Sequence, residues 1–190
     1  LRKHRKRRLR HGRKPRKTLI LERISIHDRP AIVTERSRFG DWEADQMQFQ
    51  KQRPRLAVQT ERKTLAVRLQ RVANKTAEEH TQALTRTFDD LPPGLAKTLT
   101  FDNGSENAGH AMIRDTFNLA TYFCDAYAAW QKGGVENAIG LIRRFLPKQA
   151  DLATVTDDDL QRIQEALNNR PRKKLNYQTP NEALGVALNS

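Results

Sequence analysis

Hydrophobic and polar residues alternate along the first half of the chain, and this alternation predicts β-strands. Residues 41–49 change between apolar and polar positions with a period of two, which places every second side chain on one face of a strand. Residues 56–60 and 65–72 are two more apolar runs, joined by a short polar turn. These three segments predict an antiparallel start to a sheet.

The second half of the chain alternates helical periodicity with short apolar runs. Thr76 and Glu79 have the spacing of a capping box, which predicts a helix beginning at residue 77 and running to about 88. Further helices are expected at residues 110–117, 130–145 and 157–167, with a last short one at 181–188, and further strands at 98–102 and 119–124.

The predicted order is therefore β-β-β-α-β-α-β-α-α. Three antiparallel strands followed by strands that alternate with helices are typical of a mixed sheet covered by helices. The pattern predicts an α/β fold with a five-stranded mixed sheet.

Composition divides the chain into a charged arm and an ordinary domain. The 190 residues are 37% hydrophobic, with a mean hydropathy of −0.80 and a net charge of +13. Residues 1–17 contain eleven Lys or Arg and no acidic residue, so the 24 basic and 22 acidic residues that remain carry only +2. We expect a basic, disordered arm or linker at residues 1–27 and one domain at residues 28–184.

The basic arm has the charge of a polyanion-binding segment. Its contribution to binding is expected to fall steeply with added salt, because each neutralised phosphate releases counterions. Arg7 and Arg8 are candidate DNA contacts within it. A solubility tail or a localisation signal is the alternative interpretation.

The single cysteine and the absence of long apolar runs narrow the cellular setting. Cys124 has no partner for an intramolecular disulfide, which disfavours an extracellular protein, and it is expected to be a small buried residue. No run reaches the roughly eighteen apolar residues of a membrane span. We expect a cytoplasmic protein. Because the chain starts at Leu1, it is also expected to be a fragment.

The most informative helix is the one predicted at residues 130–145. Its apolar stripe should face a core. Glu136, Gly140 and Arg143 recur at i, i+4 and i+7 on a neighbouring face. These three residues then lie in line along the helix. Glu136 can bind a metal ion, Gly140 has no side chain, and Arg143 can hold a phosphate. The alternative is an ordinary surface face.

Three acidic residues sit where strand ends and this helix can converge. Asp45 lies on the first predicted strand, Asp102 ends the fourth, and Glu136 is on the helix after the fifth. Ionised carboxylates repel one another unless hard cations lie between them, and Mg²⁺ is the natural oxygen-bound choice. Two such ions can support phosphoryl transfer. Spacing alone is weak evidence, and the flanking motifs carry more information.

The flanking motifs are GDWEAD at 40–45, LTFDNG at 99–104, the stretch 130–146, and LNNRPRKKL at 167–175 with Tyr177, Thr179 and Pro180. With these motifs the chain resembles the catalytic half of a DDE transposase of the insertion-sequence-thirty family, which has the integrase catalytic core. The resemblance covers roughly residues 28–184.

The resemblance implies an RNase H-like fold with helices on both faces of the sheet. It implies that Asp45, Asp102 and Glu136 are the catalytic, metal-binding residues, with two Mg²⁺ or Mn²⁺ ions as cofactor. It also implies cleavage of DNA at transposon ends, strand transfer into target DNA, and a homo-oligomer on paired ends, in a nucleoid-associated bacterial protein. Departures from the family pattern occur at Ala44, at residues 128–129 and at Val135.

Other functions remain open at this point. Family members bind transposon ends through N-terminal helix-turn-helix regions, and no such region is recognisable in this chain. A catalytically silent DNA-binding remnant of a truncated transposase is therefore the alternative. A general RNase H-type nuclease shares the acids but does not account for the basic arm.

Several further residues have two interpretations. Glu43 is expected to form a salt bridge rather than to bind metal, Trp42 and Trp130 to pack rather than stack on bases, and His80 and His110 to lie at the surface or at caps. A plain turn role is preferred for Asp125, whereas for Asn103 a turn role and the orientation of water or DNA are equally plausible. The candidate phosphate contacts are Lys132, Arg143, Arg144, Arg170, Arg172, Lys173 and Lys174.

Overall fold

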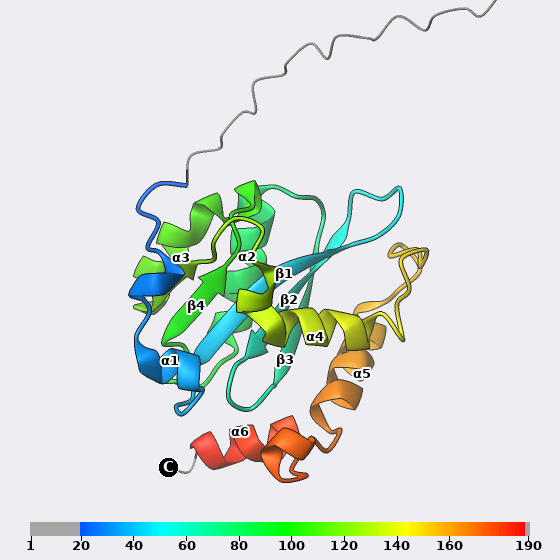
Figure 1. The fold of residues 1–190 in the computed structure, drawn as a ribbon. Helices are drawn as coiled ribbons and strands as arrows, with labels where there is room; N and C mark the ends of the chain where they lie inside the picture. The colour runs from blue at the N-terminus through cyan, green and yellow to red at the C-terminus, as the bar shows by residue number, and fades with distance from the viewer. Residues whose placement is uncertain (1–19, 189–190) are drawn as a thin grey trace, which may run out of the picture.

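A five-stranded mixed sheet forms the centre of the computed structural model, which describes residues 20–188 (Figure 1). The strand order is β3-β2-β1-β4-β5. β1 pairs antiparallel with β2, and β2 with β3, whereas β1, β4 and β5 are parallel to one another. The strands are β1 (Asp41–Gln48), β2 (Arg55–Glu61), β3 (Val67–Val72), β4 (Thr98–Phe101) and β5 (Ala120–Phe123).

Helices cover both faces of this sheet. In Figure 1, α4 crosses one face, and α2 and α3 lie behind the other. The helices are α1 (Ala31–Glu35), α2 (Ala77–Asp89), α3 (His110–Phe117), α4 (Gly133–Ile142), α5 (Asp157–Asn168) and α6 (Pro180–Leu188). Among residues 20–188, none of these helices has the length and apolar character needed to cross a membrane. The predicted RNase H-like α/β fold is confirmed, and the predicted elements occur in the predicted order, with the additional short helix α1 before β1.

The period-two pattern of β1 divides the core into two halves. Trp42 and Ala44 pack with residues of α2 and α3, and the Trp42 indole N–H donates to the Leu95 carbonyl at 2.7 Å. Met47 packs on the opposite face with residues of α4 and α5. Odd-numbered positions of β1 therefore face α4, and Asp45 is one of them.

Some predicted details were wrong. The helix predicted at residues 130–145 is divided into a 3₁₀ turn, Ala129–Lys132, and α4, and the short helix α1 was not predicted. His80, which we expected at the surface or at a cap, is buried within α2. His110 is also buried, although it does occupy a cap position, at the end of the 3₁₀ turn Ser105–Gly109. His110 contacts the Thr121 hydroxyl at 3.0 Å and the Leu21 carbonyl at 2.8 Å, because α3 packs beside β5.

Residues 20–28 run alongside β5 and contact the domain. Ser25 forms a β-bridge with Phe123, and the Phe123 amide donates to the Ile24 carbonyl at 2.9 Å. The remainder of the predicted basic arm, including Arg7 and Arg8, lies outside the described residues. The predicted boundary between residues 27 and 28 stays a prediction.

Side chains of α5 bond to the backbone of β3, the edge strand of the sheet. Asn168 accepts from the Val67 amide at 2.8 Å and donates to the Val67 carbonyl at 2.9 Å. Gln164 accepts from the Leu69 amide at 2.9 Å. These side chains satisfy edge groups that a further strand would otherwise pair.

The substitution Asn168→Ala should lower the free energy of unfolding by about 2 kcal/mol, because it leaves a buried N–H and C=O of Val67 without partners. Urea denaturation measures this loss. The matched control is Asn137→Ala, at an exposed position of α4, which should change stability by less than about 0.5 kcal/mol. Equal effects of the two substitutions would contradict the assigned role of Asn168.

Candidate active site

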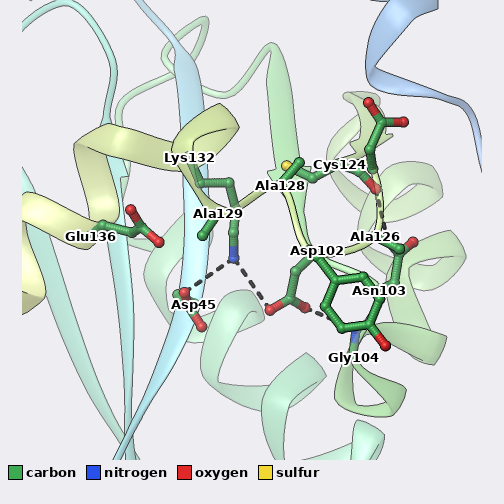
Figure 2. A pocket seen from close by; sticks show the side chains of 12 residues that line it. Asp45, Asp102, Asn103, Gly104, Cys124, Ala126, Ala128, Ala129, Lys132 and Glu136 are labelled. Carbon is green, nitrogen blue, oxygen red and sulfur yellow. Dashed lines mark hydrogen bonds and ion pairs between the residues drawn. The ribbon is translucent and has the colours of Figure 1, made fainter.

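The fold brings the three predicted acids to one pocket of about 440 Å³ (Figure 2). Asp45 lies within β1, and Asp102 follows the last residue of β4, the parallel neighbour of β1. Glu136 lies in the first turn of α4, which packs across β1 and β2. Residues separated by up to 91 positions in the sequence therefore line the same cavity.

Hydrogen bonds fix one oxygen of each aspartate. The Asp102 Oδ1 accepts from the Gly104 amide at 2.9 Å and from the Asn107 side chain at 2.8 Å. The Asp45 Oδ1 accepts from the Gln46 amide at 2.7 Å. In both residues Oδ2 is the oxygen that takes part in the ion pairs of the pocket.

A buried lysine joins the two aspartates. The Lys132 Nζ lies 3.1 Å from Asp45 Oδ2 and 3.5 Å from Asp102 Oδ2, as the dashed lines in Figure 2 mark. It also donates to the Ala44 carbonyl at 3.1 Å. We expected Lys132 among the phosphate contacts, but only 2% of the residue is accessible, because its ammonium reaches acceptors on β1 and at the end of β4.

Electrostatics shift the pKa values of Asp102 and Lys132 toward their ionised forms. Burial opposes the charged form of Asp102, but the Lys132 ammonium and the Gly104 amide outweigh it and hold the pKa of Asp102 below its ordinary value. Burial likewise lowers the pKa of Lys132, and the two aspartates more than reverse that effect, so its pKa is raised.

Glu136 occupies the wall of the pocket rather than this ion-paired group. Its side chain projects from α4 toward the cavity and is exposed (Figure 2). Among residues 20–188, no three His, Cys, Asp or Glu side chains are close enough together to hold one metal ion. The structure thus brings Asp45 and Asp102 together and places Glu136 at the side of the same pocket.

Glu43 connects the strand that carries Asp45 to the helix that carries Glu136. Its fully buried carboxylate is paired with Arg62, as the salt-bridge interpretation predicted, and Oε2 accepts from the Val135 amide at 2.9 Å. A Cβ on Gly134 would lie 2.8 Å from that oxygen. Glycine is therefore required where the helix meets β1.

Two exposed aromatic residues flank the pocket. Tyr127 is 101% exposed and lines the cavity, and Trp130 is 75% exposed. The packing role expected for Trp130 was therefore wrong, whereas Trp42 is buried as expected. Nearby, Asp125 accepts from the Gln131 side chain at 2.9 Å, and Asn103 donates to the Cys124 carbonyl at 2.7 Å.

The remaining candidate cations lie apart from the acids. Arg143 donates to the Gln48 carbonyl and lies 5.0 Å from the centre of the Phe49 ring, so it is bound to the end of β1. Arg172 is half-buried and donates to the Leu167 carbonyl at 3.1 Å. The exposed members are Arg144, Arg170, Lys173 and Lys174.

Sequence reasoning missed three residues that shape this site. Lys132 was assigned a different contact, and the roles of Asn107 and Arg62 were not anticipated. The only available signal was that Asn107 follows Asp102 closely in the sequence. Arg62 and Lys132 bind partners on distant elements, which local periodicity does not reveal.

The same fold occurs in retroviral integrases. The catalytic core domain of BIV integrase superimposes with a TM-score of 0.58 at 17% identity, over 76% of this chain and 92% of that one. No protein-family model matches the chain. The sequence identity of the chain to curated relatives is about twice as high as its identity to this integrase.

Two transposases illustrate that similarity. The transposase for insertion sequence element IS1086 of Cupriavidus metallidurans is 37% identical over 89% of this chain and 50% of its own length. Transposase InsI for IS30A of Escherichia coli is 38% identical over 95% of this chain and 49% of its own length. The chain belongs to the IS30 family of transposases. It spans about half the length of these relatives.

In this IS30-family chain, Glu43→Gln tests whether the buried ion pair holds the pocket together. The substitution leaves the Arg62 charge buried without its partner and should lower the free energy of unfolding by about 3 kcal/mol. Urea denaturation gives the value. Glu165→Gln, on the exposed side of α5, is the control and should change stability by less than about 0.5 kcal/mol.

An unchanged midpoint for Glu43→Gln would contradict this assignment. A loss of stability without any change in the tryptophan fluorescence of the native state would still agree with it, because the amide can accept from Val135 as the carboxylate does.

Proposed function

We propose that this chain is the catalytic region of a transposase that cleaves DNA strands and joins them to target DNA with Mg²⁺ or Mn²⁺. The observation that carries the proposal is the convergence of Asp45 and Asp102 on one buried cation, in a pocket that Glu136 also lines. Membership of the IS30 family supports it, since the relatives are transposases.

The donor atoms of the pocket suit a divalent cation. Asp45 and Asp102 each direct one carboxylate oxygen at the same point, where the Lys132 ammonium stands in for a positive ion. Hard oxygen ligands of this kind are the ones that Mg²⁺ and Mn²⁺ prefer. Asp45 and Asp102 would hold the ion, with Glu136 as the further carboxylate on the pocket wall. The family pattern favours two ions.

When bound, such ions activate a water or hydroxyl and stabilise the leaving oxygen of a phosphodiester. The protein's own residues hold the carboxylates of the site in position. Asn107 and the Gly104 amide orient the Asp102 carboxylate, and Glu43 fixes α4 and hence Glu136 against β1. The Asp102 carboxylate and the backbone that carries Glu136 are thus held in position before a DNA strand enters.

Exposed aromatics on the segment that leads into α4, and exposed cations farther from the pocket, offer contacts for DNA. Tyr127 and Trp130 offer faces on which unpaired bases can stack. We assign phosphate contacts to the exposed cations and retain Arg143, Arg172 and the arm as secondary candidates. The full set is Arg144, Arg170, Lys173 and Lys174, then Arg143 and Arg172, then Arg7 and Arg8.

The assembly proposed here is a homo-oligomer on paired transposon ends, which works on nucleoid DNA in the bacterial cytoplasm.

The substitution Asp102→Asn tests the chemistry with little change in shape. Loss of this carboxylate should remove several kcal/mol of transition-state stabilisation, or about three orders of magnitude in the rate of strand cleavage. The assay follows Mg²⁺-dependent nicking and joining of duplexes that carry the inverted repeats flanking the coding region. Asp158→Asn, at an exposed position of α5, is the matched control and should keep full activity.

Three results would overturn the proposal. Cleavage that survives Asp102→Asn would exclude this acid from the chemistry. DNA binding in a gel shift, without metal-dependent nicking by the unsubstituted chain, would favour the silent remnant. Preferential cutting of an RNA–DNA hybrid would favour an RNase H-type nuclease.

A further inference from the structure

Lys132 occupies the central position of the pocket described above, and its ammonium group is fully engaged. An ammonium has three N–H donors. Three acceptors surround this one, namely the Ala44 carbonyl at 3.1 Å, Asp45 Oδ2 at 3.1 Å and Asp102 Oδ2 at 3.5 Å. No donor is left for a DNA phosphate while these contacts persist.

The Lys132 ammonium is more deeply buried than the two carboxylates that it contacts. Only 3% of the Lys132 side chain is accessible, compared with 25% for Asp45 and 44% for Asp102, so the ammonium lies beneath the carboxylates. A cation buried to this degree is retained only where opposite charges and hydrogen bonds compensate it. Both aspartates give it the oxygen that their other hydrogen bonds leave available.

We propose that Lys132 is a built-in counter-ion of the Asp45–Asp102 pair and that it competes with the divalent cation for the same two oxygen atoms. Without metal, the ammonium holds two like charges together. When metal binds, two cations would share one site, and their repulsion requires the lysine to move away. Lys132 is thus a positioning residue that weakens metal binding. This inference rests on the metal site of the proposed function.

The origin of Lys132 on the chain allows such a movement. It is the last residue of the 3₁₀ turn Ala129–Lys132, next to Gly133, which has open space where a side chain would be. The long, flexible stem of lysine can carry the ammonium away from the acids without moving α4. The backbone position of Glu136 is held independently, by the bond between Glu43 and Val135.

The test is a titration of the whole chain with Mn²⁺ in the absence of DNA, with free Mn²⁺ measured by electron paramagnetic resonance. Lys132→Met keeps the apolar stem and removes the charge, and should bind Mn²⁺ at least about tenfold more tightly than the unsubstituted chain. The Mn²⁺-induced rise in unfolding temperature should also be larger for the variant, because its metal-free form lacks the counter-ion.

Three comparisons sharpen this result. Lys132→Gln retains a donor for the Ala44 carbonyl and replaces Lys132→Met in the test if that variant does not fold. It should also bind Mn²⁺ more tightly than the unsubstituted chain does. Lys148→Met removes an exposed positive charge and should leave Mn²⁺ affinity within about twofold. Adding Asp102→Asn to Lys132→Met should abolish the gain, which places the ion in this pocket.

Equal or weaker Mn²⁺ binding by folded Lys132→Met and Lys132→Gln would overturn the inference. So would the absence of Mn²⁺ binding by every variant, a result that would also remove the metal site. Tighter binding by the variants together with no DNA cleavage by any form would leave this inference standing and would contradict the proposed function alone.

Discussion

The pocket depends on one buried carboxylate, that of Glu43. It is fully removed from solvent, paired with Arg62, and bonded to the Val135 amide at the start of α4. A charge in the interior is stable only when its partners are complete, so β1, Arg62 and α4 must come together as a unit. Because Asp45 follows Glu43 by two residues and Glu136 follows Val135 by one, this contact sets the distance between two of the acids.

The sequence allowed much of this architecture to be predicted. The alternation in β1 correctly placed Glu43, Asp45 and Met47 on one face, and the predicted strands and helices gave the confirmed fold. Charge compensation could not be predicted in the same way. The acceptors around Lys132 come from β1 and from the end of β4, and only the folded sheet brings them together.

Exposure was also hard to predict for residues near the pocket. Trp130 and Lys132 are two positions apart, yet one is exposed and the other buried, which agrees with the rotation of about 200° between such residues around a helix. Residue type favours the opposite assignment, because an indole is usually buried and a lone lysine is usually solvated. Lys132 is buried because acceptors on β1 and at the end of β4 surround its ammonium group.

The most direct test of the account is the location of Mn²⁺ in crystals of this chain, from its anomalous scattering. The account predicts a manganese ion in contact with the carboxylates of both Asp45 and Asp102, with the Lys132 ammonium moved away from them. Manganese bound only elsewhere, in crystals where Lys132 still bridges the two aspartates at saturating Mn²⁺, would contradict it.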